Sequence, residues 1–362
     1  MGTRARSPRT ALLAVLVVVA SLLTVPLAAV PAEAAVLRRS SVWLPYWSMS
    51  ASLQRVTSNP DLFHTASPYW YDARSCGSIA GYTGAGSSSV ITALRGKGVK
   101  VVPMVSASGL TPSLAISCFG NASNRKVHVD RLVALARSRA YDGLDLDYEH
   151  LALTTSVDLG RRVRAALSLL VRDVCAALDR VRKTCVITVM PRTSTSWTVW
   201  RGKLMPAVYD YAAIGVHADR VRVMAYDQHA GAFGPGPIGG YPWTQSVARF
   251  TRATVPPSKV ELGTALYGRD FAGGSSTSVV SAKARSLAAA KGATVRFDAT
   301  QREHTATWTS LGTRHVLWWS SAAAVGHRVD LSRAYGFAGN AFWAAGQEDS
   351  ATWSTVRAHS RS

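Results

Sequence analysis

Apolar residues along this chain fall into two patterns, short continuous runs and longer stretches in which they recur every three or four positions. The short runs predict eight strands, over residues 42–46, 64–70, 99–105, 143–148, 185–190, 221–226, 260–266 and 339–343. The longer stretches predict helices over residues 124–138, 156–182, 244–254 and 280–291. The longest of these helices has one apolar face, as expected of a helix packed on a sheet, formed by Val163, Leu167, Leu170, Val171, Val174 and Leu178.

Strands that alternate with helices in this way predict an α/β fold, and eight such units indicate a (β/α)₈ TIM barrel. A doubly wound open sheet is the alternative, but no G-x-G-x-x-G follows the first strand. The stretch over about 271–334 is longer than one helix needs and holds strand-like residues at 294–297 and 315–319. We therefore expect a monomer with a single barrel domain over residues 35–362 and a small α+β insertion between the seventh and eighth strands.

The first 34 residues have the composition of a secretory signal peptide. Three arginines precede an apolar run over about 11–30, and Ala32-Glu33-Ala34 supplies a small-x-small cleavage site. The alternative is an uncleaved membrane anchor, since the run approaches the roughly 20 residues that span a bilayer. Pro26 and the cleavage site favour removal. We expect a secreted, extracellular protein that is not inserted in the membrane once the signal is removed.

Export would place the four cysteines in an oxidising compartment, where disulfides form. Cys175 lies late in a predicted helix and Cys185 at the start of the next strand. We predict a Cys175–Cys185 disulfide, which leaves Cys76 to pair with Cys118, although four cysteines allow three connectivities. No C-x-x-C or clustered histidine accompanies them, so we predict neither a bound metal nor a cofactor.

The chain is strongly basic, with 41 Lys and Arg against 21 Asp and Glu, a net charge of +20 and a pI near 10.4. Such a pI is one footprint of nucleic-acid binding. The alternative is codon bias in a GC-rich genome, because arginine supplies most of the positive charge. No helix-turn-helix, zinc-finger spacing or aromatic RNA-binding motif is present, and with export expected we predict no nucleic-acid partner.

The fourth predicted strand carries an unusual concentration of acids. Strand side chains alternate between faces, so Asp145, Asp147 and Glu149 share one face and the apolar residues between them share the other. In a barrel the acidic face points inward, with Glu149 last, at the mouth where barrel active sites lie. Neighbouring carboxylates raise at least one pKa, which provides a protonated general acid. A solvated acidic edge and a Ca²⁺ or Mg²⁺ site are the alternatives.

The sequence D-G-L-D-L-D-Y-E at 142–149 matches the D-G-x-D-x-D-x-E signature of family 18 glycoside hydrolases. Residues 224–227 resemble the M-x-Y-D end of that family's sixth strand, 259–269 its seventh strand, and 339–349 its eighth. The resemblance spans about 42–353 and is strongest to the bacterial branch that includes spore-cortex and cell-wall hydrolases. It implies a catalytic barrel.

The resemblance also implies a substrate-assisted, retaining mechanism. Glu149 would be the general acid, and the substrate's own 2-acetamido oxygen would be the nucleophile. Asp147 would hold the acetamido N–H in position, and Asp145 would share a proton with Asp147. Tyr226 would donate its O–H to the acetamido oxygen as charge develops.

Further residues would contact the sugar. Trp343 would form a hydrophobic floor, with Met224 packed beside it. Asp227 and Arg269 would hydrogen-bond sugar hydroxyls or else brace the barrel rim. Aromatic residues at the ends of the first two strands would stack on sugars or cap the barrel; the group is Tyr46, Trp47, Tyr69 and Trp70, of which Tyr46 and Trp70 are the predicted contacts.

We therefore expect a secreted hydrolase that cleaves β-1,4 bonds in glycans containing N-acetylglucosamine, namely chitin, chitooligosaccharides or peptidoglycan. The alternative is a chitinase-like protein that binds such glycans without cleaving them, which is disfavoured because Glu149, Asp147 and Tyr226 are all present. The third strand departs from the family pattern, since it lacks S-x-G-G, and only Ser106 is left there to support Asp145.

Overall fold

Eight parallel strands close into a barrel, which confirms the predicted fold class. The predicted strand over 99–105 is split into β4 and β5, and each of the other seven predicted runs forms one barrel strand. Strand β1 pairs with both β2 and β15, which completes the ring. In order around the barrel the strands are β1 (Ser40–Pro45), β15 (Gly339–Trp343), β9 (Val260–Ala265), β8 (Arg220–Val223), β7 (Thr184–Val189), β6 (Gly143–Asp147), β5 (Met104–Ser106) and β2 (Phe63–Ser75). The short β4 (Lys100–Val101) and β3 (Ser78–Gly81) also pair with β2.

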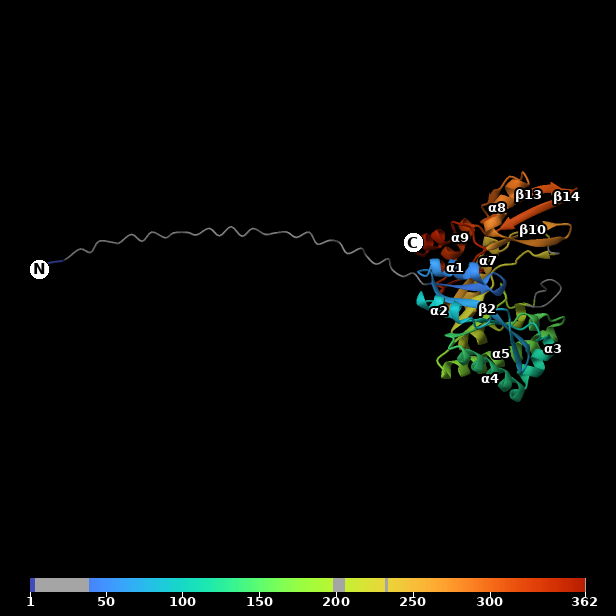
Figure 1. The fold of residues 1–362 in the computed structure, drawn as a ribbon, viewed down its shortest axis with the longest axis horizontal. Helices are drawn as coiled ribbons and strands as arrows, with labels where there is room; N and C mark the ends of the chain where they lie inside the picture. The colour runs from blue at the N-terminus through green and yellow to red at the C-terminus, as the bar shows by residue number, and fades with distance from the viewer. Residues whose placement is uncertain (4–38, 198–205, 232–233, 362) are drawn as a thin grey trace. The chain divides into compact units, whose positions relative to one another are not determined.

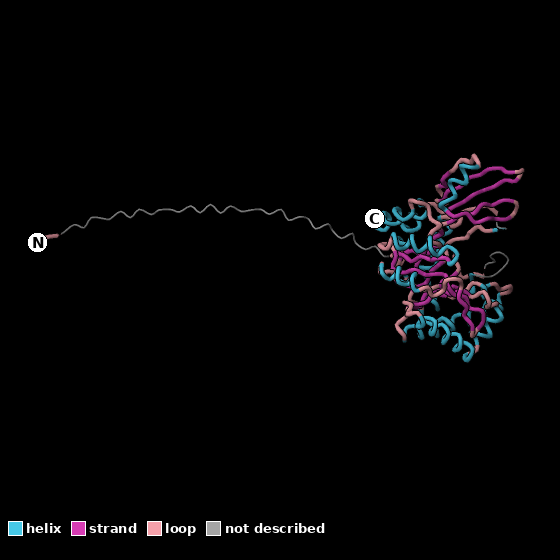
Figure 2. Tube along the Cα trace, viewed as in Figure 1, coloured by secondary structure: helices cyan, strands magenta, loops and turns pink. Residues whose placement is uncertain are grey.

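Helices lie outside this ring of strands (Figure 2). They are α1 (Met49–Ser58), α2 (Ser88–Gly96), α3 (Pro112–Ala115), α4 (Ala122–Ser138), α5 (Val157–Arg180), α6 (Tyr211–His217), α7 (Tyr241–Thr254), α9 (Ala322–Ala334) and α10 (Thr352–Arg361). Single helical turns occur at Tyr46–Ser48, Ile116–Gly120, His150–Ala152, Pro206–Val208 and Pro257–Lys259. The predicted helices over 124–138, 156–182 and 244–254 correspond to α4, α5 and α7.

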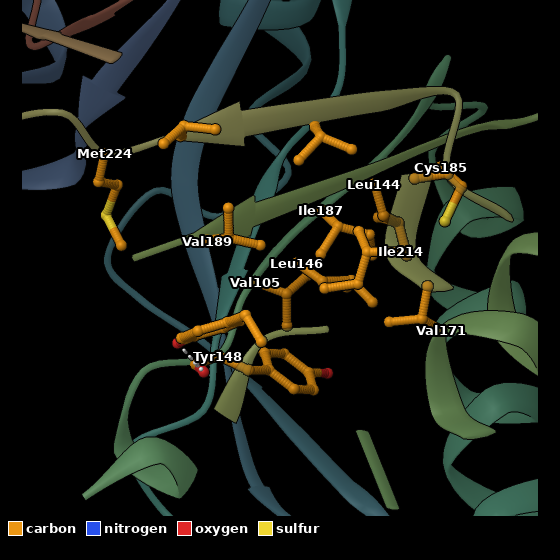
Figure 3. Packing of buried hydrophobic residues seen from close by; sticks show 14 of the residues in the cluster. Val105, Leu144, Leu146, Tyr148, Val171, Cys185, Ile187, Val189, Ile214 and Met224 are labelled. Atoms are coloured by element: carbon orange, nitrogen blue, oxygen red, sulfur yellow. Dashed lines mark hydrogen bonds between the residues drawn. The ribbon is translucent and has the colours of Figure 1, made fainter. Parts of the chain in front are cut away.

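The apolar face predicted for the longest helix is buried against the sheet. All six of its residues are at most 4% exposed and belong to the main core cluster. That cluster also contains the outward-facing strand residues Leu144, Leu146 and Ile187, which lie close to Val171 in Figure 3. The core therefore fills the space between strands and helices and fixes which side chains of β6 face the barrel interior.

A five-stranded antiparallel sheet with one helix is inserted after β9. Its strand order is β11 (Ser275–Val280), β10 (Tyr267–Ala272), β14 (Thr313–Trp319), β13 (Glu303–Ser310) and β12 (Arg296–Asp298), and α8 (Ser281–Ala290) packs on it. Figure 1 shows this segment in orange, on the far side of the barrel from α4 and α5. The inserted segment begins at Tyr267, earlier than the predicted 271. Helix α9 packs on the barrel strands β9 and β15 and so belongs to the barrel, which means that the predicted end of the insertion at 334 is too late.

Two disulfides tie outer elements together, with the predicted pairing. Cys76 in the turn between β2 and β3 is bonded to Cys118 in the turn before α4. Cys175 of α5 is bonded to Cys185 of β7. Each bridge links neighbouring units of the barrel.

The computed structural model describes residues 1–3, 39–197, 206–231 and 234–361. The predicted signal peptide over 1–34 lies outside these ranges, apart from its first three residues. Residues 36–362 form one compact unit. Within the described ranges, the helices are too short or too polar to cross a bilayer.

Candidate active site

Strand β6 carries its acids into the barrel interior, as the alternation predicts. Asp145 is fully buried and Asp147 is 5% exposed, whereas Leu144 and Leu146 belong to the outer core. Glu149 follows the carboxyl end of the strand. In parallel barrels that end of the strands forms the mouth, so Glu149 stands at the entrance and Asp145 lies deepest.

A cavity of about 800 Å³ opens above these acids. Seven predicted site residues line this cavity, and they lie in or directly after β6, β8, β10 and β15. They are Asp147, Glu149, Met224, Tyr226, Asp227, Arg269 and Trp343. Its wall also includes Trp43, Trp47, Tyr69, Ser106, Ser108, His150 and Tyr267. The barrel therefore gathers residues from distant parts of the chain around one carboxyl pair.

Asp147 and Glu149 are both biased toward the protonated form. Burial, followed by the charges of Glu149 and Asp145, raises the pKa of Asp147 well above its ordinary value. Burial and the nearby Asp227 carboxylate raise the pKa of Glu149 to about 7, and His150 opposes this rise. A carboxyl group with a pKa near neutrality can donate a proton at neutral pH, as general-acid catalysis requires.

Tyr226 faces the same carboxyl pair. Burial, with the charges of Asp147 and Glu149, raises the pKa of its hydroxyl well above the ordinary value. The ring of Tyr267 lies edge-on to it, with centroids 6.3 Å apart. Tyr226 therefore keeps its proton and serves as a hydrogen-bond donor to any group bound between it and Asp147.

Asp145 is held by donors other than Asp147. Its Oδ1 accepts a 2.7 Å hydrogen bond from Thr188. Its Oδ2 accepts hydrogen bonds of 2.8 Å from Trp43 Nε1 and 2.6 Å from Arg222 Nη1. These donors come from β1, β7 and β8, and the expected sharing of a proton between Asp145 and Asp147 stays a prediction.

Asp227 and Arg269 are bound to each other at the cavity rim. Arg269 donates to both carboxylate oxygens of Asp227, at 2.8 Å each, and the Tyr267 hydroxyl donates to Oδ1 at 2.6 Å. This geometry supports the rim-bracing interpretation. Both side chains also line the cavity.

Trp343 and Met224 line the cavity as predicted. The Trp343 ring lies 5.8 Å from Trp43 and 6.4 Å from Tyr69, centroid to centroid. Trp43 is 1% exposed and donates to Asp145. One aromatic group thus forms the apolar wall and is hydrogen-bonded to the deepest acid.

Two predicted aromatic contacts were placed wrongly. Trp70 is fully buried in the outer core near Tyr141, because its neighbour Tyr69 takes the inward face and adjacent strand residues alternate. Tyr46 stacks on Tyr82 with centroids 4.5 Å apart and is not among the lining residues. Trp47, 58% exposed, lines the cavity in its place.

The proposed support of Asp145 by Ser106 was also wrong. The Ser106 hydroxyl donates to Asp72 Oδ1 at 2.9 Å instead. Arg222, which does hold Asp145, was missed by the sequence reading. A signal was present, because Arg222 shares strand parity with Met224 and Tyr226 and so puts a charge on an inward face.

The oxygens of the deepest acid are occupied by hydrogen-bond donors. Within the described ranges, no cluster of three or more His, Cys, Asp or Glu is arranged to hold a metal ion. Trp43, Thr188 and Arg222 already donate to the oxygens of Asp145, whose lone pairs a cation would need as ligands.

The sequence of this chain matches a known protein family. The family model described as Glycosyl hydrolases family 18 matches residues 78–348. The uncharacterised glycosylase YvbX of Bacillus subtilis strain 168 is 28% identical over 253 residues, covering 67% of this chain and 69% of that protein. The cortical fragment-lytic enzyme of Bacillus anthracis is 28% identical over 176 residues, covering 46% of this chain and 39% of the enzyme.

Solved structures share the fold. A chitinase from Chromobacterium violaceum ATCC 12472 superposes with a TM-score of 0.79 at 24% identity, covering 88% of this chain and 98% of the chitinase. The spore cortex-lytic enzyme SleL of Bacillus megaterium QM B1551 superposes with a TM-score of 0.75 at 16% identity, covering 88% of this chain and 73% of SleL. The barrel and the inserted sheet thus form an architecture seen in both kinds of protein.

Proposed function

This chain belongs to glycosyl hydrolases family 18, and from that premise we propose that it cleaves β-1,4 bonds next to N-acetylglucosamine with retention of configuration. The observation that carries the proposal is the pair Asp147 and Glu149 at the barrel mouth, both with raised pKa values and both facing Tyr226. A general acid, an acceptor for an N–H group and a hydroxyl donor meet there, as a substrate-assisted reaction requires.

In the first step Glu149 donates its proton to the glycosidic oxygen, and the bond from that oxygen to C1 breaks. The carbonyl oxygen of the substrate's 2-acetamido group attacks C1 and forms an oxazolinium ring. Asp147 accepts the acetamido N–H on a carboxyl oxygen, while Tyr226 donates to the acetamido oxygen. Holding the acetamido group against C1 supplies the proximity that makes the attack intramolecular.

In the second step water attacks C1 from the opposite face of the ring. Glu149, now a carboxylate, accepts the proton of that water, and the bond between C1 and the acetamido oxygen breaks. Glu149 returns to its protonated form, and two inversions at C1 give net retention. The raised pKa of Glu149 suits both roles, because a group with a pKa near 7 both gives and takes protons near neutral pH.

The substrate class we propose is a glycan of the bacterial cell wall or chitin. The relatives in sequence include a cortical fragment-lytic enzyme, and those in structure include a chitinase. The strongly positive net charge of the chain, most of which lies outside residues 1–34, favours an anionic wall polymer over neutral chitin through electrostatic steering. The same proposal includes export, which the signal-like N-terminus and the two disulfides support.

Hydrolysis of N-acetylated chitooligosaccharides and of peptidoglycan by the purified protein tests this function. Glu149→Gln is expected to lower kcat by about 10²-fold or more, since it removes the general acid. Glu303→Gln is the matched control, because Glu303 is a fully buried glutamate that is not among the cavity-lining residues. Binding of both glycans without hydrolysis by the wild type would instead identify a chitinase-like binding protein.

A further inference from the structure

Positive charge gathers at the end of the barrel opposite the mouth. Each connection from a helix into the next strand lies at that end, because the strands run toward the mouth and the helices run back. Three such connections are neighbours, since β5, β6 and β7 are adjacent in the sheet. Counted with the last residues of helices α2, α4 and α5, the three connections cover residues 95–100, 137–142 and 179–183.

These connections are rich in cations and poor in acids. They contain two aspartates, Asp142 and Asp179, against eight lysines and arginines. Seventeen residues therefore hold eight of the 41 lysines and arginines of the chain and have a net charge of +6. Lys183 is half-buried, and the other seven cations are exposed. We call these cations the base patch, and they are Arg95, Lys97, Lys100, Arg137, Arg139, Arg180, Arg182 and Lys183.

Helix stability accounts for only part of this charge. Cations in the last turn of a helix interact favourably with the helix dipole, and Arg95, Arg137 and Arg180 stand in such turns. Arg182 and Lys183 follow the end of α5, beyond its last turn. The charge of the base patch therefore needs a second explanation.

Hydrogen bonds join the three connections into one surface. The backbone N–H of Asp142 donates to the carbonyl oxygen of Val101 at 2.9 Å, and the N–H of Thr184 donates to that of Asp142 at 2.9 Å. The Arg95 side chain crosses to the second connection, where it donates to the carbonyl oxygen of Ala140 at 2.5 Å and to Asp142 Oδ2 at 3.3 Å. The barrel therefore fixes the backbone from which the cations project.

A shallow hollow lies within the base patch. It is lined by Arg137 and Ala140 from the second connection and by Val181 and Lys183 from the third. Two cations and two apolar side chains thus border one concave spot. An anionic group that enters the hollow meets a guanidinium and an ammonium group, and both form strong, charge-assisted hydrogen bonds with carboxylates.

Cations spread over three connections suit a polymer better than a single small anion. Neighbouring strands lie about 4.8 Å apart, so three of them span about 10 Å, which is wider than one carboxylate group. A polymer with carboxylates repeated along it can meet several cations at once, which raises its overall affinity. Peptidoglycan has this chemistry, since its peptides carry carboxylates, and it belongs to the proposed substrate class.

We propose that the base patch is a second binding site for peptidoglycan, at which one strand of the wall is held while the mouth receives another. The two sites lie at opposite ends of the barrel strands, so both are available at the same time. Among the described residues, those that line the active-site cavity include none of the base patch. The choice of peptidoglycan as partner rests on the proposed function.

Co-sedimentation with insoluble peptidoglycan, purified free of phosphate-bearing wall polymers, tests this site. Glu149→Gln is the starting protein, so that the polymer is not digested. Three charges are then removed from the patch by Arg137→Gln, Arg182→Gln and Lys183→Gln. We expect the dissociation constant to rise about tenfold at low salt, because three surface contacts of modest strength are lost. Unchanged binding would overturn the proposal.

The matched control removes the same charge from another surface. Lys283→Gln, Arg285→Gln and Lys291→Gln change three exposed cations in α8 and directly after it. We expect this triple variant to bind peptidoglycan as tightly as the starting protein does. An equal loss of binding in both triple variants would also overturn the proposal, because the total charge would then decide binding and its location would not.

Hydrolysis with Glu149 intact provides a second readout. With the three base-patch substitutions, the rate on soluble, uncharged N-acetylated chitooligosaccharides is expected to stay within about twofold of the wild type, since surface changes away from the cavity have small effects. The rate on insoluble peptidoglycan is expected to fall several-fold, because less enzyme is held on the polymer. Equal rates of both proteins on the insoluble polymer would contradict the proposal.

Two further outcomes separate this proposal from its alternatives. A base patch that binds double-stranded DNA and does not bind peptidoglycan would contradict the choice of partner. A wild type that cleaves no N-acetylglucosamine glycan contradicts the proposed function, and co-sedimentation still decides whether the base patch binds peptidoglycan.

Discussion

Single side chains set the chemistry of this site through burial and charge. Asp147 and Glu149 have raised pKa values because both are enclosed and face other carboxylates. Asp145, on the same strand face, is surrounded by donors. One motif therefore contains three acids with different environments, and the difference comes from residues outside the motif.

The raised pKa of Glu149 predicts the alkaline limit of activity. The proposed mechanism needs Glu149 protonated to donate to the leaving group, and burial with the Asp227 carboxylate raises its pKa to about 7. We expect kcat/KM to fall above about pH 7, tenfold per pH unit once the limb is reached. Initial rates from pH 4 to 10 on a chitooligosaccharide measure this. A profile that stays flat up to pH 9 would exclude Glu149 as the acid.

The same carboxyl group links stability to pH. Its pKa rises from 4.5 to about 7 on folding, so the native state binds more protons across that window and loses stability as the pH increases through it. Glu149→Gln removes this loss, which amounts to about 1.4 kcal/mol per unit of pKa shift. We expect Glu149→Gln to gain stability over the wild type between pH 5 and pH 8.5 in urea unfolding. A stability difference independent of pH would contradict the linkage.

At the scale of elements, the periodicity of apolar residues was enough to place the barrel. The eight strands and the helix faces follow from it because each element must bury one face against its neighbour. The site was predictable as far as strand alternation reaches, which gave Asp145, Asp147 and Glu149. The same rule was misapplied at Trp70. Tyr69 lines the cavity, so the next residue of the strand, Trp70, has its side chain on the outer face.

Contacts between distant elements were the part that a local pattern does not contain. Arg222 lies 77 residues from Asp145 and 39 from Glu261 in sequence. The residues next to either acid do not indicate that it is paired with this arginine. The limits of the insertion were misjudged for a related reason. Helix α9 follows the inserted sheet in sequence but packs on β9 and β15, so its assignment depends on tertiary contacts.

The packing of α5 on the sheet can be tested directly. Leu167 is 4% exposed within the main core, and its truncation to alanine leaves a cavity. We expect Leu167→Ala to reduce the free energy of unfolding by about 2–5 kcal/mol. Leu311→Ala is the control, because Leu311 is fully exposed, and we expect a change within about 0.5 kcal/mol. Equal effects in urea unfolding would contradict the assigned core.

At the scale of the whole molecule, charge is divided between a basic chain and an acidic catalytic centre. The chain carries +20, yet Asp145, Asp147 and Glu149 gather at one barrel strand. A basic exterior attracts anionic polymers over about a Debye length, which is about 10 Å at 0.1 M salt. The proposed wall substrate would give this charge a role in substrate capture, whereas codon bias would not.

Salt dependence tests this explanation. We expect kcat/KM on peptidoglycan fragments that bear carboxylates to fall several-fold between about 0.02 and 0.5 M NaCl, because salt screens the attraction. Uncharged N-acetylated chitooligosaccharides serve as the control and are expected to show little change. Equal salt dependence for both substrates would leave the positive charge without a role in substrate capture.

A substrate that supplies its own nucleophile must carry the N-acetyl group, so removal of that group tests the proposed mechanism. Chitooligosaccharides of equal length, fully N-acetylated and fully de-acetylated, are incubated with the enzyme, and product formation is followed by chromatography. We expect cleavage of the acetylated oligomer and none of the de-acetylated one, because the latter lacks the attacking carbonyl oxygen. Comparable hydrolysis of both would contradict it and point to a nucleophile on the protein.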